Sequence, residues 1–555
     1  MSAVFLTATE LRDGGPEGLT KALERALWHL GFQDVRIIDG AHDHGADVLA
    51  VRAREQWVFQ CKWKAHGTAD HAGVDDLERA RTYYQADKAV LVTNTNVSTS
   101  AEARRKALAG IGIDVALWHG ATLHAIGQRM PDRVPTSYAL RPYQEQAVAA
   151  IERDLDTEGT ALLVLATGLG KTVVGGDVIG NLLISRPDAR VLVVAHMRDL
   201  VSQLEKALWR HLPKSVPTRL LTGETKQPRT LDGVVVATVE SALSAICGGY
   251  KPDLVMIDET HHVAETGRFA DLLDLCGTAR RFGVTATPWR GDKFDITARF
   301  GRPSFKMGIA EGMAAGYLSA VDYKLYADGV DWDTVQDISR HGYSIKDLNR
   351  RLFLPQRDEE IVEHLRTAWR ETAEPRAIMF CQTIEHAEHM ASLLAVSDPA
   401  WANASCIHGG LSKRHRDVLL NEFRLGRVPL ITCVDVFNEG VDVPDVNLIA
   451  FLRVTHSRRI FVQQLGRGLR LSPGKKALQV LDFVTDIRRA AAVLNLRRTL
   501  ETEETEHLEL PHVSRIQFQD ETVGSLMDMW IQDAANLETA ADEVRLQFPL
   551  PKGIL

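Results

Sequence analysis

The segment from Ala161 to Val174, ALLVLATGLGKTVV, constrains the fold of this chain more than any other. An apolar run ends abruptly at Thr167-Gly168-Leu169-Gly170-Lys171-Thr172, and an apolar, helix-compatible segment follows. This order predicts a buried strand, a glycine-bearing loop and a helix, which together bind the phosphates of a nucleotide. Glycines let the backbone approach the phosphates closely, and the helix N-terminus supplies free N–H groups and the positive end of a dipole.

Two side chains of this loop have chemical roles in the prediction. We expect Lys171 to reach the β and γ phosphates and Thr172 to offer a hydroxyl to Mg²⁺. The strict pattern has a glycine five residues before Gly170, and this chain has Leu165 there. The loop therefore favours ATP and Mg²⁺ as cofactors, and the segments that follow it strengthen that prediction.

Length and composition limit the class of protein. A chain of 555 residues is too long for one core and suggests about three or four domains. The sequence shows neither an apolar run long enough for a membrane span nor a signal-peptide pattern, so we expect a cytoplasmic protein. The six cysteines form no CxxC pair, which argues against a zinc ribbon and a disulfide framework. The net charge of −8 decides neither for nor against DNA as a partner.

Strand and helix signals alternate from Glu17 to about Leu123, and two adjacent predicted strands carry polar groups. Asp47 lies at the start of one strand, and Gln60 and Lys62 lie on one face of the next because side chains alternate along a strand. These groups suit metal-assisted hydrolysis of a phosphodiester. Asp47 and Gln60 would hold Mg²⁺, while Lys62 would orient the nucleophile and offset developing charge.

This segment resembles the Mrr-like restriction endonucleases, a branch of the PD-(D/E)XK nucleases in which Gln replaces the second acidic residue. The resemblance rests on LGF at 30–32, DHGAD at 43–47, QCK at 60–62 and LVTNTNVSTSAEARRKA at 91–107. The family has a glutamate in its first helix, where this chain has Thr20, and Glu24 lies one turn later on the same face. The alternative is a nuclease-shaped module that only binds DNA, with Asp47 and Lys62 forming an ion pair.

A polar segment with two prolines, QRMPDRVPTS at 128–137, predicts a domain boundary. From LRPYQEQAV to about Thr485 the chain resembles the superfamily 2 helicases. The resemblance implies that Arg141 and Gln144 contact adenine, a role that suits an amide because it donates and accepts hydrogen bonds at once. Taken alone, these residues indicate only a helix start with an early Pro142.

The predicted strand DLVMID delivers Asp258 and Glu259 to its carboxyl end, where ligands bind in open α/β sheets. The helicase family has DEAH or DECH at this box, and the chain has DETH. The resemblance implies that Asp258 holds Mg²⁺ and that Glu259 orients and deprotonates the attacking water. Thr285 and Thr287 match the motif that couples the nucleotide state to lobe closure in the family.

Further helicase motifs imply contacts with nucleic acid and nucleotide. The residues expected to contact nucleic acid are Arg198, Thr238, Ser241, Gln382 and Thr432. Thr432 also belongs, with Asn438, Gly440 and Asp442, to the motif that bridges nucleic acid and nucleotide in the family.

The segment QQLGRGLR at 463–470 fits the family's QxxGRxxR, which places Gln463 at the nucleotide. Arg467 and Arg470 are three residues apart on one predicted helix face, so they project together. A planar guanidinium binds the spread charge of a phosphoryl group in two places, which lysine does not. The alternative is a charged surface helix. The loop, the acid pair and this helix occur in the order that an ATP-driven motor requires, which disfavours that alternative.

The predicted fold class is α/β, with an N-terminal PD-(D/E)XK-type nuclease fold, two RecA-like parallel-sheet lobes and a helical C-terminal tail. The expected parts are the nuclease domain at 1–127, a linker at 128–137, the lobes at 138–309 and 310–490, and the tail at 491–555. The resemblances imply an ATP-dependent DNA motor fused to a metal-dependent endonuclease that acts on foreign DNA, with no membrane partner. Two alternatives stay open: a motor whose N-terminal module only binds DNA, and an RNA helicase or ATP-driven switch that cuts nothing.

Overall fold

The structure is a computed structural model. It describes residues 2–38, 45–135, 139–223, 230–286, 295–326, 358–381, 383–434, 446–452, 468–471, 475, 477–483 and 513–518. The chain forms two compact units. The first contains the N-terminal domain and most of the first lobe up to residue 305, and the second contains residues 164–169 and the chain from Lys306 onward.

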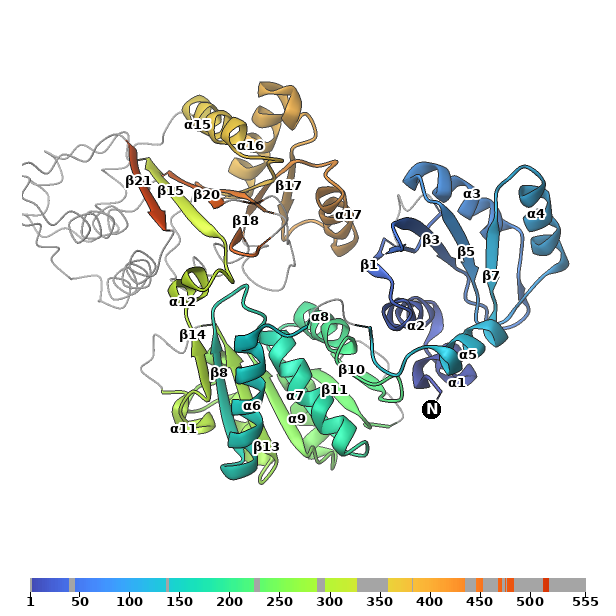
Figure 1. The fold of residues 1–555 in the computed structure, drawn as a ribbon, viewed down its shortest axis with the longest axis horizontal. Coiled ribbons are helices and arrows are strands. Elements are labelled where there is room, and N and C mark those ends of the chain that lie inside the picture. The colour runs from blue at the N-terminus through green and yellow to red at the C-terminus, as the bar shows by residue number, and fades with distance from the viewer. Residues whose placement is uncertain are drawn as a thin grey trace, which may run out of the picture. The chain divides into compact units, whose positions relative to one another are not determined.

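The N-terminal domain is a five-stranded mixed sheet with helices on both faces (Figure 1). In spatial order its strands are β1 (Gln33–Ile37), β2 (Val48–Arg52), β3 (Glu55–Cys61), β5 (Lys88–Val92) and β7 (Val115–Trp118). The first three strands are antiparallel, and β3, β5 and β7 are parallel. A separate pair is formed by β4 (Thr68–Ala69) and β6 (Asn96–Val97). The helices are η1 (Val4–Leu6), α1 (Ala8–Asp13), α2 (Gly15–His29), α3 (Ala72–Tyr84), α4 (Thr99–Gly110) and α5 (Gly120–Arg129).

Alternation along β3 divides the core of this domain between the two faces of the sheet. Phe59 belongs to the apolar cluster that includes Leu23 and Leu27 of α2. Val58 belongs to a second cluster, which includes Leu77 of α3. The two clusters hold β3 between helical layers, and β3 carries Gln60 at its end.

The first lobe is built on a seven-stranded sheet with flanking helices (Figure 1). Its strands, in spatial order, are β10 (Thr218–Leu221), β11 (Val234–Thr238), β9 (Val191–Ala195), β12 (Leu254–Asp258), β13 (Arg280–Thr285), β8 (Thr160–Leu165) and β14 (Phe305–Met307). Its helices are α6 (Pro142–Thr157), α7 (Lys171–Ser185), α8 (Arg198–Trp209), α9 (Val239–Cys247), η2 (Thr260–His262), α10 (Arg268–Leu275) and α11 (Thr297–Phe300). Helix α12 (Ile309–Ala314) follows β14 and belongs to the second unit. The run from β10 to β13 is parallel. Its inner strands β9, β11 and β12 are buried at every residue, as expected when helices cover both faces.

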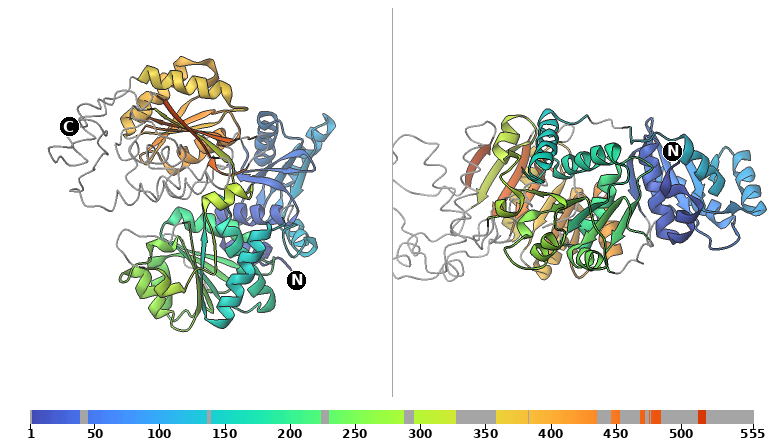
Figure 2. Two further views of the ribbon diagram at one scale, coloured as in Figure 1. Left: turned by 60° about the vertical axis from the view of Figure 1, so that its left-hand side comes forward. Right: turned by 90° about the horizontal axis from the view of Figure 1, so that it is seen from below.

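The second lobe repeats this design with another seven-stranded sheet. Its strands, in spatial order, are β17 (Ser405–His408), β18 (Leu430–Val434), β16 (Ala377–Phe380), β19 (Leu448–Phe451), β20 (Ala477–Phe483), β15 (Ala320–Tyr326) and β21 (Val513–Phe518). Its helices are α15 (Asp358–Glu371), α16 (Ile384–Ser397), η3 (Pro399–Trp401) and α17 (Lys413–Arg424). Helices α15 and α16 lie together on one face of the sheet (Figure 2), where Leu365 and Met390 join its core.

One part of the predicted tail differs from the expected helix. Residues 513–518 form strand β21, which pairs antiparallel with β15. The sequence VSRIQF contains a β-branched pair and an aromatic residue, which favour an extended strand over a helix. The edge of the parallel sheet supplies the partner that such a strand needs.

Buried cations join the N-terminal domain to the first lobe within the first unit. The Arg25 guanidinium donates hydrogen bonds to the carbonyls of Pro213 and Val216, at 3.0 and 2.9 Å. Lys214 does the reverse, because its ammonium donates to three carbonyls at the end of the N-terminal domain: Gly127 at 3.1 Å, Gln128 at 3.1 Å and Met130 at 2.7 Å. Part of the predicted linker is thus hydrogen-bonded to the first lobe.

Among the described residues, no helix combines the length and the apolar character needed to cross a bilayer.

Candidate nucleotide and nuclease sites

The glycine-bearing loop lies between the end of β8 and the start of α7. Leu165, which replaces the glycine of the strict pattern, is the last residue of β8 and is fully buried. Gly168 and Gly170 have φ values of +92° and +86°, which favour glycine. Helix α7 begins at Lys171, so its free N–H groups and its positive dipole end face the loop.

The remaining loop residues occupy two environments. Thr167 is half-buried, Leu169 is fully buried, and Thr172 is half-buried in the first turn of α7. Leu169 therefore anchors the loop through packing, while the Thr167 hydroxyl is buried and has no hydrogen-bond partner among the described residues.

The acid pair lies at the carboxyl end of β12, next to the cation of the loop. The Lys171 ammonium is 3.2 Å from the nearer carboxylate oxygen of Glu259. Burial, followed by the charge of Glu259, raises the pKa of Asp258. Burial also acts to raise the pKa of Glu259, but the charges of Lys171 and His261 outweigh it and lower that pKa. Glu259 is therefore ionised. Ionisation of Asp258 would place a second negative charge beside it, which is unfavourable in a buried site, and a divalent cation would offset that charge.

Glu259 also has an unusual backbone. Its φ and ψ of +50° and +58° are left-handed, which is uncommon for a residue other than glycine. This conformation ends β12 and starts the short helix η2. At this sharp turn the Glu259 carboxylate lies next to the Lys171 ammonium.

Histidines connect the DETH box to two neighbouring motifs. His261 Nδ1 is 3.2 Å from the Thr285 hydroxyl and 3.3 Å from Glu259 Oε2, which links the box to the predicted coupling motif. The His262 ring packs against the His196 ring in a tilted arrangement, with ring centroids 3.9 Å apart and an interplanar angle of 31°. His196 was not predicted from the sequence, although its place directly after β9 and shortly before Arg198 was a signal for a residue between two motifs.

Gln144 lies beside the loop, as its predicted role requires. A Cβ atom at Gly170 would come within 2.7 Å of Gln144 Nε2, so the amide and the loop are neighbours. The Gln144 carbonyl oxygen accepts from the Arg141 N–H at 3.0 Å, and its amide donates to the Tyr143 hydroxyl at 3.3 Å. Arg141 precedes α6, and the same backbone contact fixes its position.

The predicted nucleic-acid contacts differ in their exposure. Arg198 is exposed at the first residue of α8. Thr238 caps α9 and donates a hydrogen bond to the Ser241 hydroxyl at 3.1 Å. Thr432 is fully buried and donates to the Ala387 carbonyl at 2.7 Å, and its contact with nucleic acid stays a prediction. Seven other predicted site and motif residues lie outside the described residues: Thr287, Gln382, Asn438, Gly440, Asp442, Gln463 and Arg467.

In the N-terminal domain the structure brings Asp47 and Gln60 together. Gln60 Nε2 donates to Asp47 Oδ2 at 2.5 Å, and the Cys61 N–H donates to the same oxygen at 2.5 Å. The other amide atom, Gln60 Oε1, is buried and has no hydrogen-bond partner among the described residues. A buried carboxylate next to an unsatisfied amide oxygen fits a divalent cation, which takes oxygen ligands.

Lys62 pairs with a residue that the sequence motifs did not indicate. Its ammonium is 2.7 Å from Asp76 Oδ2 on α3. The alternative ion pair of Lys62 with Asp47 is therefore not the one that the structure shows. An acidic residue in the amphipathic segment that follows QCK was the available signal, but its partner depends on how α3 packs on the sheet.

Glu24, the candidate for the missing family glutamate, points to the first lobe. Its carboxylate is 2.9 Å from the ammonium of Lys206 on α8. Burial raises the pKa of Glu24, and the charge of Lys206 opposes that effect. Thr20, at the family's usual position, is buried and donates to the Pro16 carbonyl of its own helix at 3.3 Å. The described nuclease site thus contains the carboxylate of Asp47 and the amide of Gln60.

Three families of known proteins match successive parts of the chain. Residues 11–126 match the family described as restriction endonuclease, residues 137–290 the type III restriction enzyme res subunit, and residues 357–472 the helicase conserved C-terminal domain. These matches follow the order that the motifs predicted.

Two individual relatives are identical to this chain at about a quarter of the matched positions. The EcoAI endonuclease subunit, a type I restriction enzyme of Escherichia coli, is 27% identical over 62% of this chain and 46% of its own length. The DNA 3'-5' translocase XPB2 of Sulfurisphaera tokodaii is 27% identical over 62% of this chain and 81% of its own length. The chain thus spans about half the length of the restriction subunit.

A solved structure extends the likeness to almost the whole chain. The ATP-dependent type ISP restriction-modification enzyme LlaBIII, bound to DNA, has a TM-score of 0.51 and 16% identity, and it covers 96% of this chain and 39% of its own. At this identity the likeness shows the fold, and it confirms the predicted α/β architecture. The three family matches identify the chain as a superfamily 2 helicase with an N-terminal Mrr-type restriction endonuclease domain.

Proposed function

We propose that this protein is an ATP-driven DNA translocase fused to a metal-dependent endonuclease, acting in the cytoplasm against foreign DNA. The observation that carries the proposal is the arrangement at the end of β12, where Glu259 lies 3.2 Å from Lys171 beside a loop with two left-handed glycines. A cation at a helix N-terminus next to a buried acid pair suits the hydrolysis of a nucleoside triphosphate.

In the proposed reaction Lys171 and the N–H groups of α7 bind the phosphates, while Gln144 and Arg141 contact the base. Asp258 and Thr172 would hold Mg²⁺, which neutralises phosphate charge when bound. Glu259 orients the attacking water and accepts its proton, because its low pKa keeps it ionised. The resemblance adds Arg467 and Arg470, which would stabilise the charge of the transferring phosphoryl group.

The proposed nuclease site uses Asp47 and Gln60 as oxygen ligands for Mg²⁺, which polarises the phosphodiester and activates water when bound. Lys62 would sit beside the attacking water and offset the developing negative charge.

The domain boundaries at 127, 137, 309 and 490 remain part of this proposal.

Two variants of the full chain test the proposal, with plasmid DNA as substrate and Mg²⁺ and ATP varied separately. Lys171→Ala removes the cation aimed at the β and γ phosphates, so DNA-stimulated ATP hydrolysis should be abolished. Asp47→Ala removes the carboxylate ligand, so cleavage should vanish while ATP hydrolysis continues, because Gln60 alone offers one neutral oxygen. ATP turnover at the wild-type rate in Lys171→Ala would contradict the proposed motor function.

The same assay separates the two alternatives. If the wild-type chain hydrolyses ATP on DNA but cuts no plasmid under any metal or methylation condition, the N-terminal domain binds DNA without cleaving it. Two observations favour this DNA-binding alternative: Gln60 offers a neutral amide, and the Glu24 carboxylate is paired with Lys206. Stimulation of ATP hydrolysis by RNA and not by DNA would instead indicate an RNA helicase or ATP-driven switch.

A further inference from the structure

Lys475 binds the backbone at the end of the QxxGRxxR segment. Its ammonium donates hydrogen bonds to the carbonyls of Val446 at 2.8 Å and of Arg470 at 3.2 Å, and to the carbonyl of Gly468. An ammonium has three N–H donors, and these carbonyls match that number. Two of the three acceptors belong to the segment that ends at Arg470, and Val446 lies just before β19.

The backbone at this point is also fixed by packing. A Cβ atom at Gly468 would overlap the Leu478 side chain on β20 and come within 3.1 Å of Ile449 on β19. Leu469 is fully buried, and its carbonyl accepts from the Ser319 N–H at 2.8 Å. Gly468 and Leu469 therefore rest directly on the sheet, which leaves the carbonyls on either side of Leu469 to be satisfied by other groups.

Lys475 satisfies those carbonyls. Gly468 is helical and Arg470 is not, so the helix ends between them. Carbonyls at a helix end lack partners within the helix, and a lysine close to them stabilises both their hydrogen bonding and the negative end of the dipole. By holding the carbonyls of Gly468 and Arg470 against Val446, Lys475 fixes the point from which the Arg470 side chain extends.

We propose that Lys475 is a positioning residue for Arg470 in ATP hydrolysis, an inference that rests on the proposed role of Arg470. A side chain that acts on a transition state loses its effect when its backbone moves by a fraction of a residue length. A displacement of about 1 Å can reduce a rate by about 100-fold. Lys475 acts through the backbone of Arg470 and has no role in binding the nucleotide itself.

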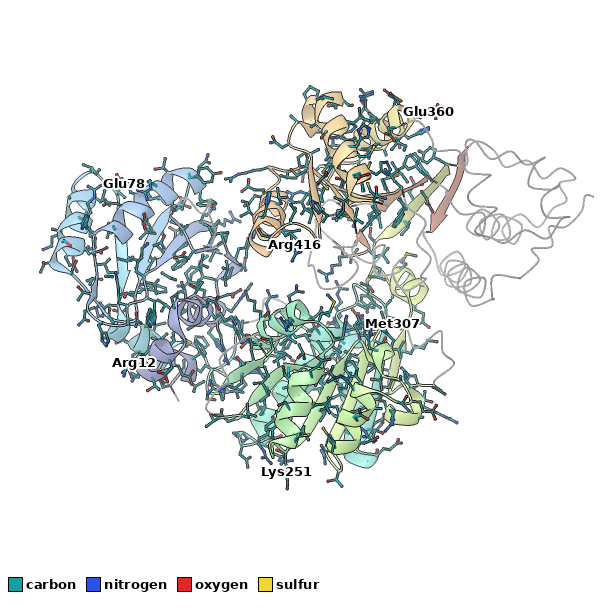
Figure 3. The ribbon with its side chains drawn as sticks, turned by 180° about the vertical axis from the view of Figure 1, so that it is seen from behind. Arg12, Glu78, Lys251, Met307, Glu360 and Arg416 are labelled. Atoms are coloured by element: carbon teal, nitrogen blue, oxygen red, sulfur yellow. The ribbon has the colours of Figure 1, made fainter. Side chains whose placement is uncertain are left out.

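The test measures DNA-stimulated ATP hydrolysis by the full chain carrying Lys475→Met, which keeps the length of the side chain but removes its donors. We expect kcat to fall about 10- to 100-fold, with the KM for ATP within about 2-fold of wild type, since only transition-state interactions are lost. Lys475→Arg keeps donors for the carbonyls and should retain most of the activity. Lys251→Met, at an exposed lysine that projects from the first lobe (Figure 3), is the matched control and should behave as wild type.

A double variant distinguishes positioning from a general structural effect. If Lys475 acts through Arg470, then Arg470→Ala with Lys475→Met should be no slower than Arg470→Ala alone, because the second change has nothing left to misplace. Losses that multiply would overturn the proposal, as would a raised KM with unchanged kcat. Should Lys475→Met fail to fold, Lys475→Gln, which keeps an N–H₂ donor, replaces it in the same comparison.

The single variant Arg470→Ala separates failure of this inference from failure of the proposed function. If Arg470→Ala turns over ATP at the wild-type rate, the proposed role of Arg470 is wrong. A slow Lys475→Met in that case would show that Lys475 serves another group, which also overturns the inference. If Arg470→Ala is slow and Lys475→Met is not, the proposed function stands and only the inference about Lys475 fails.

Discussion

At the scale of single residues, the arginines of the QxxGRxxR segment allow a clear prediction. Arg467→Ala and Arg470→Ala should each lower ATP turnover by about 10³- to 10⁵-fold, since arginine fingers stabilise charge that develops in the transition state. Nucleotide binding to the resting protein should change little, as measured by titration with a fluorescent ATP analogue. A collapse of ATP affinity with normal turnover at saturation would mean that these residues are binding groups.

His29 provides a residue-scale prediction about pH. It is fully buried, its Nδ1 is 3.2 Å from the Pro131 carbonyl, and burial together with the charge of Arg25 lowers its pKa from 6.5 to about 3. In the unfolded chain the His29 imidazole binds a proton as the pH falls through 6.5, whereas in the folded chain the imidazole stays neutral down to about pH 3. The free energy of unfolding should therefore decrease as the pH falls from 6.5 toward 3.

His29→Gln removes this titration and should make the stability of the N-terminal domain less dependent on pH over that range. The measurement is the unfolding midpoint followed by tryptophan fluorescence at a series of pH values. His66→Gln, at an exposed histidine of the same domain, is the control and should keep the wild-type slope. Equal slopes for His29→Gln and wild type would show that His29 is not a source of the dependence.

At the scale of elements, helix α2 illustrates what sequence patterns predict and what they do not. Its apolar positions predict an amphipathic helix, and the structure has one at Gly15–His29. The partners of its polar face could not be predicted, because Glu24 and Arg25 contact Lys206, Pro213 and Val216 in another domain. The pairing of Lys62 with Asp76 was hidden for the same reason, since it depends on the packing of α3.

The loop at β8 and α7 shows the opposite case. Its strand, glycines and helix are adjacent in sequence, so local rules predict both the fold and the place of Lys171. The parallel sheets also follow from alternating strand and helix signals. Contacts between elements distant in sequence, such as the His196–His262 ring contact, require the folded arrangement.

Helix α2 also gives a prediction for the nuclease site. Glu24→Gln should leave DNA cleavage intact, because the Glu24 carboxylate is paired with Lys206. It should lower the thermal stability of the first unit, by less than the roughly 3–5 kcal/mol of a fully buried pair, since the Lys206 side chain keeps 34% of its surface exposed. Glu17→Gln, at an exposed position of the same helix, is the control for the melting and cleavage assays. Lost cleavage with unchanged melting would make Glu24 the missing metal ligand.

At the scale of the whole molecule, the buried cations Arg25 and Lys214 bear on how parts of this protein can be exchanged with those of relatives. A boundary drawn at residue 127 passes through the carbonyls that Lys214 binds, and it separates Arg25 from its acceptors at Pro213 and Val216. A nuclease domain grafted there onto a foreign motor would leave Arg25 without these two carbonyl acceptors. The part of the chain suited to exchange is therefore the N-terminal domain together with the first lobe. A chimera that keeps these two parts together would preserve both sets of hydrogen bonds.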